Sequence, residues 1–517
     1  MIHSILDWEK EENIYQKDYT RTSVFRDLHL DEIMEVMTKE GESTLIREKF
    51  GHPLRDKKAI EYRQEIMRDF EDHHFREKTV SFIEMLKDTK LCIQRMKRED
   101  KKVLSLMEDS EVLYLAGRYC ETLEELENYM KSKVQSQGLK RFAEEVMEYI
   151  EGDGFQSLKN EIQQLYSKLE EIRFCMLIKD GQFHIRPYEE EKYIDEEIYR
   201  IFSRFNIGKE EDSNNNQILD RNARHIDEAI LNLLSHWYGN VFDELKKFGK
   251  RNIDFINEEL LQFAEEAEFY IRWQNLSWEL QNQGLDFCYP QITEKYKGTG
   301  CRDGFDLALA LKLSNRNKKI VTNSFYMEEN EKKIVITGPN QGGKTTYARC
   351  LGQIFYLSSI GCSVPGKEVH TWLYDGLYTH FEKDEAKAKG HGKLQDDIER
   401  LWEIMEKVNE NSIVIINEIY ASTTLEDATY LGKKMMEELS NKGCFVVCVT
   451  FIDELAKFDK STVSMMSTVN SENGERYFKI VRKPPDGLAY AMTLANKYEL
   501  DYAALKRRLN YGDTSAV

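Results

Sequence analysis

Residues 334–346 read IVITGPNQGGKTT, and this stretch decides the fold. Its apolar β-branched start predicts a buried strand, residues 338–345 fit G-x-x-x-x-G-K-S/T, and a helical pattern begins at Tyr347. In this order of strand, loop and helix, glycines let backbone N–H groups reach phosphate oxygens. The stretch therefore predicts an ATP site with Mg²⁺ in an α/β P-loop domain. The predicted nucleotide contacts are Gly338, Pro339, Asn340, Gln341, Gly342, Gly343, Lys344, Thr345 and Thr346.

Within this motif two side chains have specific chemistry. Lys344 is expected to neutralise the β- and γ-phosphates, and the Thr345 hydroxyl to bind the magnesium ion. An accidental glycine-rich turn is the competing interpretation. The agreement of strand, loop, Lys-Thr pair and helix argues against it.

A second apolar strand, Ser412 to Ile416, ends in Asn417-Glu418. In P-loop ATPases an acidic residue here contacts magnesium through water, and a following Glu polarises the attacking water. We therefore predict Glu418 as the catalytic base and Asn417 as a metal-site residue. Because the amide oxygen of Asn417 carries no negative charge, we expect slower or weaker metal-dependent ATP hydrolysis. Alternatively, Glu418 is only the first residue of a helix.

The chain has 517 residues, which is enough for more than one domain. Residues 1–300 read as mainly α-helical, with a small hairpin near 173–187 around Asp180-Gly181 and a polar loop at 209–217. After residue 300, short β-rich runs alternate with helices, including 445–449 and 478–481. We expect a helical region at 1–300 and an α/β ATPase domain at 301–517, ending in a helical segment.

Charge is distributed unevenly between these two parts. Residues 301–517 hold 29 Lys and Arg against 30 Asp and Glu, which leaves 44 against 62 and a net charge of −18 for residues 1–300. Nucleic-acid binders usually show a basic face, so DNA binding here needs separate support. No membrane span or signal is evident, and nine cysteines without CxxC pairs favour the cytoplasm.

The motifs resemble those of the MutS family of DNA mismatch repair ATPases. Residues 336–346 are similar to its I-T-G-P-N-x-G-G-K-S/T-T segment, and 361–365 to the G-x-x-V-P that follows. Asp375 to Thr379 resembles the D-x-I/L-F/Y-T strand, and 417–427 resembles D-E-I with its Thr/Ser cluster and Asp. Residues 450–455 are similar to T-H-x-x-E-L, and residues 60–64 resemble the I-x-x-R-Q of the helical core, where the similarity is weaker.

The resemblance implies an ABC-type ATPase that forms a homodimer, with each nucleotide between the P-loop of one subunit and the signature segment of the other. That segment is expected at 390–394, where Gly392 and Lys393 replace the usual Ser/Thr. Lys393 is either a cation for the partner's γ-phosphate or a solvated lysine. Asn323 is either the Asn beside the adenine pocket or a turn residue.

Two departures from the family pattern favour nucleotide-controlled switching over rapid turnover. Asn417 replaces an acidic residue, and Phe451 stands at the position of the switch histidine. The helical half leaves no room for the mismatch-recognition and connector domains, and no C-terminal nuclease-type domain fits. We therefore expect a short family member.

Family members bind DNA with helical lever and clamp arms, so duplex or branched DNA is the implied partner. The candidate basic tips are Arg95, Lys97, Arg98, Lys101 and Lys102. The acidic arms leave open an alternative, a nucleotide-gated scaffold with little hydrolysis that binds a protein or ribosomal partner. An SMC-like chromosome protein is a weaker alternative, because no long heptad pattern is present.

Overall fold

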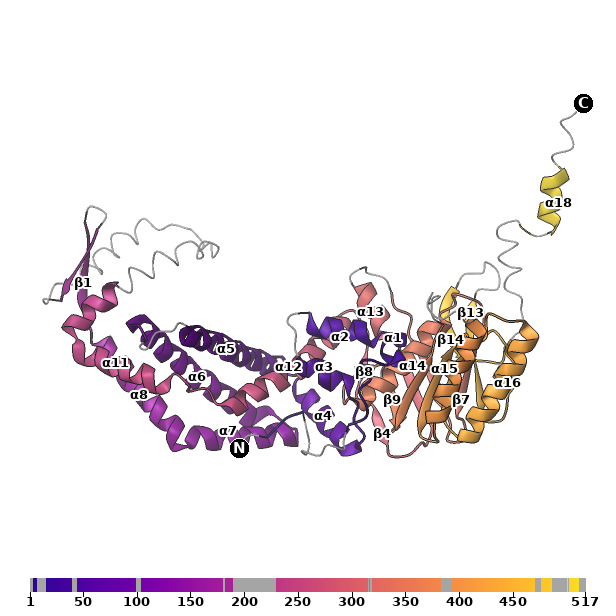
Figure 1. The fold of residues 1–517 in the computed structure, drawn as a ribbon, viewed down its shortest axis with the longest axis horizontal. Coiled ribbons are helices and arrows are strands. Elements are labelled where there is room, and N and C mark those ends of the chain that lie inside the picture. Colours follow the sequence, from indigo (N-terminus) through magenta and orange to yellow (C-terminus); the bar gives the residue numbers. More distant parts are fainter. Residues whose placement is uncertain are drawn as a thin grey trace, which may run out of the picture. The chain divides into compact units, whose positions relative to one another are not determined.

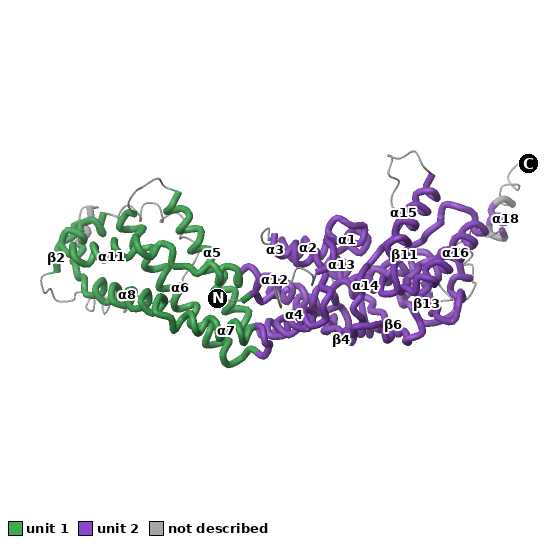
Figure 2. The backbone as a smooth tube through the Cα atoms, turned by 60° about the horizontal axis from the view of Figure 1, so that its bottom comes forward, with its two compact units in different colours: residues 1–3, 73–134, 139–264 green, residues 4–72, 135–138, 265–517 purple. Residues whose placement is uncertain are grey.

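The computed structural model describes residues 3–6, 15–39, 44–98, 104–179, 182–188, 229–314, 316, 319–382, 392–469, 476–485, 500 and 502–510. The chain forms two compact units (Figure 2). Unit 1 comprises Met1–His3, His73–Val134 and Leu139–Ala264, and unit 2 comprises Ser4–Asp72, Gln135–Gly138 and Glu265–Val517. No described helix is both long enough and apolar enough to cross a bilayer.

Unit 1 is built from long helices. They are α5 (His73–Arg98), α6 (Leu106–Lys133), α8 (Asp153–Glu170), α11 (Gly239–Asn252), most of α7 (Gln137–Glu151) and the start of α12 (Glu258–Gln281). Ser105 starts α6 with a capping box, in which its hydroxyl accepts from the Glu108 N–H and the Glu108 carboxylate accepts from the Ser105 N–H. Phe142 and Phe263 stack with ring centroids 3.9 Å apart, which joins α7 to α12.

A hairpin follows α8. Strand β1 (Phe174–Lys179) pairs antiparallel with β2 (Gln182–Pro187), with Lys179 opposite Gln182. The predicted turn Asp180-Gly181, the polar loop at 209–217 and the candidate DNA contacts Lys101 and Lys102 lie outside the described residues.

Unit 2 contains four N-terminal helices, α1 (Ser23–Asp27), α2 (Leu30–Thr38), α3 (Thr44–Gly51) and α4 (Lys57–Asp69). Arg63 of α4 is fully buried, and its guanidinium donates to the Leu6 carbonyl at 2.9 Å and to the Ile360 carbonyl at 3.3 Å. A buried guanidinium is tolerated only where acceptors meet it. Arg63 therefore joins the N-terminal segment to the C-terminal part of unit 2.

The C-terminal part of unit 2 contains a six-stranded sheet in the order β10-β11-β12-β7-β13-β14. Its strands β7, β13 and β14 are labelled in Figure 1. The strands are β7 (Lys333–Thr337), β10 (Gly376–His380), β11 (Ser412–Asn417), β12 (Phe445–Val449), β13 (Thr462–Val469) and β14 (Arg476–Arg482). The first five in this order are parallel, and β14 runs antiparallel to β13. The prediction of a mixed helix and sheet fold is confirmed.

Helices cover both faces of this sheet, which explains its continuous apolar strands. Val414 and Ile416 share one core with α15 (Lys393–Lys407) and α16 (Leu425–Lys442). Ile415 points to the other face, where its side chain meets Gly352 of α14 (Lys344–Ser359). The 3₁₀ helix η2 (Asp453–Lys457) packs against β7 and β13.

A smaller four-stranded sheet, in the order β4-β9-β5-β6, lies in the same unit. Its strands are β4 (Gln291–Thr293), β5 (Thr299–Gly304), β6 (Asn323–Met327) and β9 (Glu368–Trp372). Unit 2 also contains the antiparallel pair of β3 (Phe287–Cys288) and β8 (Val364–Pro365), helix α13 (Leu307–Ser314) and helix α18 (Tyr502–Asn510).

Candidate functional site

The glycine-rich loop, residues 338–343, connects β7 to α14 at the carboxyl edge of the large sheet. Strand β7 has parallel neighbours on both sides, so the loop lies in the middle of that edge. Gly338 and Gly343 have φ of 115° and 90°, conformations that other residues rarely adopt. The backbone therefore requires glycine at both positions.

Ser467 of β13 contacts this loop. Its hydroxyl donates to the Gly342 carbonyl at 2.7 Å. A Cβ added at Gly342 would lie only 2.3 Å from the same hydroxyl oxygen. Gly342 is thus required by close approach, whereas Gly338 and Gly343 are required by their dihedral angles.

Lys344, the first residue of α14, turns its side chain back over the loop. Its ammonium group donates to the Gly338 carbonyl at 2.8 Å, the Pro339 carbonyl at 3.3 Å and Oδ1 of Asn340 at 3.3 Å. Burial lowers the pKa of Lys344, and the Glu418 carboxylate opposes that shift from 3.9 Å. A cation is therefore fixed beside a helix N-terminus, which is an arrangement that suits an anion.

The first turn of α14 and the end of β11 bring together residues that are more than seventy positions apart in sequence. The Thr345 hydroxyl donates to Oδ1 of Asn417 at 2.9 Å. Glu418 follows with φ of 55°, and its N–H donates to the Val449 carbonyl at 2.9 Å. The hydroxyl and amide oxygens could hold a hard cation such as Mg²⁺, with phosphate oxygens supplying the charge that Asn417 lacks.

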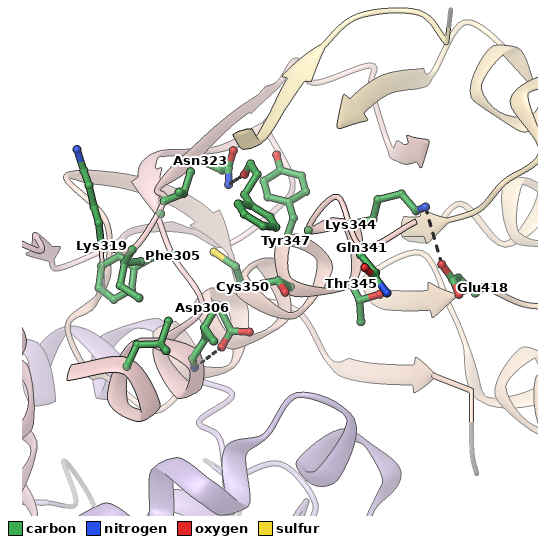
Figure 3. A pocket seen from close by; sticks show the side chains of 18 residues that line it. Phe305, Asp306, Lys319, Asn323, Gln341, Lys344, Thr345, Tyr347, Cys350 and Glu418 are labelled. Atoms are coloured by element: carbon green, nitrogen blue, oxygen red, sulfur yellow. Dashed lines mark hydrogen bonds and ion pairs between the residues drawn. The ribbon is translucent and has the colours of Figure 1, made fainter. Parts of the chain in front are cut away.

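A cavity of about 510 Å³ opens beside the loop (Figure 3). One end is polar, with Lys344, Thr345 and Glu418 in its wall. The remainder of the wall includes the apolar residues Phe305, Leu309, Leu313, Ile320, Val321, Tyr347, Cys350 and Phe478, together with the charged residues Asp306 and Lys319. A cavity in which a lysine-bearing loop adjoins a mainly apolar wall with a few polar groups fits a ligand that joins a phosphate chain to an aromatic base.

Asn323, the first residue of β6, lies in the cavity wall but uses its side chain on the backbone of β14. Its Nδ2 donates to the Phe478 carbonyl at 3.1 Å, and its Oδ1 accepts from the Ile480 N–H at 2.8 Å. Phe478 has φ of 55° between these two contacts. Asn323 thus holds the segment that presents Phe478 to the cavity.

The other predicted site residues are placed as follows. Gln341, Gly343 and Thr346 line the cavity, whereas Gly338, Pro339, Asn340 and Gly342 complete the loop without lining it. Gly392 is the N-cap of α15, and Lys393 forms an ion pair with Glu382. Neither of them lines the cavity, and the other predicted signature residues Gly390 and His391 lie outside the described part of the chain.

Sequence reasoning missed most of the apolar wall and Ser467. Ile320 and Val321 lie three and two residues before Asn323, so their closeness to that predicted site residue could have indicated them. Phe305, Ser467 and Phe478 carry no motif, because they reach the site through tertiary pairing of distant strands.

Together, the fold and the loop define an α/β domain with a glycine-rich loop at the carboxyl edge of a largely parallel sheet. Residues 334–500 match the model of MutS domain V. Over this stretch the chain is therefore similar to the MutS family, which confirms the resemblance seen in its motifs.

Individual relatives match only over part of their length. The DNA mismatch repair protein MutS of Thermotoga sp. (strain RQ2) is 28% identical over 174 residues, 33% of this chain and 22% of that protein. The human protein Msh3 is 26% identical over 152 residues, 29% of this chain and 13% of its own. MSH2 of Saccharomyces cerevisiae is 30% identical over 128 residues, 25% of this chain and 13% of that protein.

Proposed function

We propose that this protein is an ATP-dependent DNA-binding protein of the MutS type, with slow ATP hydrolysis coupled to helical arms. The observation that carries the proposal is the cavity whose polar end joins Lys344, Thr345 and Glu418. In functional terms, we assign residues 1–300 to the arms and 301–517 to an ABC-type P-loop ATPase that forms a homodimer in the cytoplasm.

In this proposal the apolar end of the cavity binds the adenine base, and the loop N–H groups bind the phosphates. Lys344 neutralises the β- and γ-phosphates. Thr345 and Asn417 hold the magnesium ion, which stabilises the charge of the reacting phosphates when bound. Glu418 orients the attacking water, and its exposure of 32% gives water access to it.

Nucleotide binding can move the arms only if the protein binds the nucleotide more tightly in one arrangement of the arms than in another. Closure of a dimer, in which Gly392 and Lys393 meet the partner's nucleotide, supplies such a difference. For Lys393 this requires that the Glu382 ion pair opens, which is inexpensive for an exposed pair.

One observation favours the second candidate, a nucleotide-gated scaffold for a protein or ribosomal partner. Two of the candidate DNA contacts are already paired, Arg95 with Glu111 at 3.4 Å and Lys97 with Asp254. These pairs reduce the positive charge available to a DNA backbone.

Steady-state ATP turnover with and without duplex or branched DNA tests the proposal. Wild type is compared with Lys344→Ala and Glu418→Gln, and with Lys433→Ala and Glu426→Gln as matched surface controls. We expect turnover in wild type and both controls, retention of ATP without turnover in Glu418→Gln, and neither in Lys344→Ala. Wild-type turnover no higher than that of Lys344→Ala would support the scaffold instead.

A mobility-shift series at two salt concentrations tests the DNA ligand. Binding that weakens with salt and responds to ATP supports the arms as a DNA clamp. Binding of no DNA form at low salt would contradict it.

A further inference from the structure

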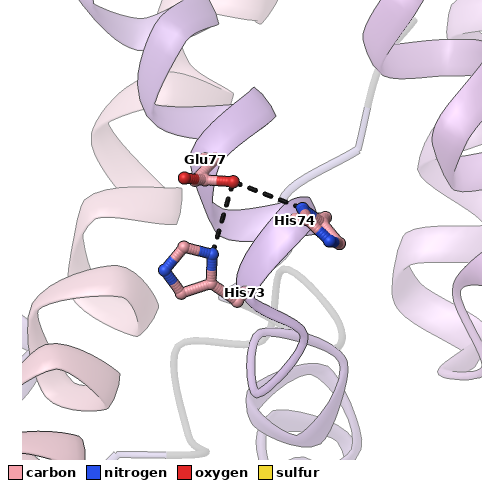
Figure 4. Close-up of side chains that lie close together, drawn as sticks. All are labelled: His73, His74 and Glu77. Atoms are coloured by element: carbon pink, nitrogen blue, oxygen red, sulfur yellow. Dashed lines mark hydrogen bonds and ion pairs between the residues drawn. The ribbon is translucent and has the colours of Figure 1, made fainter.

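The first turn of α5 in unit 1 carries a cluster that the nucleotide site does not use, formed by His73, His74 and Glu77 (Figure 4). Oε2 of Glu77 lies 3.3 Å from Nδ1 of His73 and 3.3 Å from Nδ1 of His74. The potential ligand atoms of the three residues all lie within 4.8 Å of one another. A single carboxylate oxygen thus faces two imidazole nitrogens.

We propose that this cluster is a binding site for a divalent transition-metal ion of the zinc type. Two atoms that each lie about 2.05 Å from a tetrahedral ion are about 3.3 Å apart. Both imidazole-to-carboxylate separations already have this value. Rotation of the exposed side chains allows the two imidazole nitrogens to adjust their separation.

The helix fixes the spacing of these ligands. Glu77 follows His73 by four residues and His74 by three, so all three side chains meet on one side of the first turn. The two rings are perpendicular, with centroids 6.1 Å apart, so they approach the carboxylate without stacking on each other.

The ligand types select the kind of ion. Imidazole suits Zn²⁺, Cu²⁺ and Ni²⁺, whereas Mg²⁺ prefers oxygen ligands. The cluster has no thiolate, which disfavours the softest ions. It therefore differs from the proposed magnesium site, whose ligands are all oxygens, and the two sites can be tested separately.

Exposure makes this an open site of moderate affinity. The side chains of His73, His74 and Glu77 are 60%, 79% and 61% exposed, so water completes the coordination. The positive end of α5 opposes a cation, and the charge of Glu77 offsets that effect.

Calorimetric titration of the full chain with Zn²⁺, and separately with Mg²⁺, tests the site in wild type, His74→Ala and Glu77→Gln. His370→Ala is the matched control. It is an exposed histidine 3.2 Å from Glu368, and it belongs to no such cluster within the described residues. Circular dichroism checks that each variant retains the wild-type helix content.

We expect wild type and His370→Ala to bind one Zn²⁺ ion at this site. In His74→Ala and Glu77→Gln this binding should be lost, or its affinity should be at least about tenfold weaker. The visible absorption of bound Co²⁺ should show a tetrahedral site that the same two variants lose. Mg²⁺ should not compete for it. Zinc binding that is equal in all four proteins, or lost equally in His370→Ala, would overturn the proposal.

Discussion

Asn417 is the residue at which the proposed ATP site departs most from acidic metal sites. Its amide oxygen accepts a hydrogen bond from the Thr345 hydroxyl. The contact is therefore kept, although the negative charge of an acidic residue is missing. Asn417→Asp should lower the magnesium concentration at half-maximal turnover by roughly fivefold, about 1 kcal/mol, because charged acceptors bind more strongly than neutral ones. ATPase assays across magnesium concentrations measure this. Asn441→Asp, on the exposed side of α16, should have no effect.

Gly338 gives a second prediction at the residue scale. Alanine there must adopt φ of 115°, and its Cβ would lie 3.0 Å from Cβ of Ser467. We expect Gly338→Ala to cost about 1–3 kcal/mol of loop stability and to weaken ATP binding correspondingly. Gly154→Ala is the control, because nothing lies within 4 Å of an added Cβ there. Equal ATP affinity in both variants, measured by calorimetry, would contradict this account of the loop.

Asp109 of α6 gives the third prediction, which concerns pH. It is 2% exposed and packs against Gly249 of α11. Burial raises the pKa of Asp109 to about 7, Glu108 adds to the shift and Lys246 opposes it. In the folded protein the carboxyl therefore holds a proton between about pH 4 and 7 that the unfolded chain has lost, so stability falls as pH rises through this range.

Asp109→Asn should remove this loss of folding stability with rising pH. Above pH 7 the variant should be more stable than wild type by about 1–2 kcal/mol, and near pH 4 the two should be equal. Urea unfolding at both pH values measures the difference. Asp88→Asn, an exposed position on α5, should show no such pH-dependent gain.

At the scale of elements, the contact between β6 and β14 has a testable role. Asn323 makes both of its hydrogen bonds to the backbone beside Phe478. Asn323→Ala should weaken ATP binding by about 1–3 kcal/mol, because two backbone groups lose their side-chain partner and Phe478 is no longer held. Asn323→Asp, which keeps the acceptor for Ile480 and loses the donor, should be intermediate. Nucleotide titration that finds Asn323→Ala equal to wild type would show that Phe478 is held by other contacts.

Much of the large sheet could be predicted at this scale. The strands around Val335, Val414 and Val447 are short, continuous apolar runs, and such runs are typical of strands buried on both faces. The loop after β7 carries its own motif, so Lys344 and Thr345 could be assigned from local sequence. Pairing of β11 with β12 then places Glu418 at the same edge.

The rest of the site could not be predicted because it depends on register between distant strands. Phe478 reaches the cavity only because β14 pairs antiparallel with β13, and Phe305 only because the turn after β5 faces α14. The pairing of Lys393 with Glu382 joins two exposed side chains, for which sequence patterns carry no signal. The helical pattern of residues 1–300 likewise did not indicate that residues 4–72 pack within unit 2.

At the scale of the whole molecule, the proposed coupling between nucleotide and arms makes a fifth prediction. Hydrogen exchange with saturating ATP and Mg²⁺ should show protection of residues 334–350. At 100 times the dissociation constant, binding adds about 2.7 kcal/mol of stability. Because coupling requires the arms to respond, exchange in unit 1 should change as well, and Lys344→Ala should abolish both effects. Protection confined to unit 2 would argue against coupling.

Unit 2 is made of three separate stretches of the chain, and most of unit 1 lies between the first and the last of these stretches. During synthesis the ribosome releases α4 long before β7, β11 and β12 exist. The buried guanidinium of Arg63 must therefore wait for Ile360, almost three hundred residues later, before one of its acceptors emerges. The helices of unit 1 can form in the meantime, so the nascent polypeptide carries an unfinished and partly apolar N-terminal segment for most of its translation, and a chaperone that shields this segment would raise the yield of folded protein.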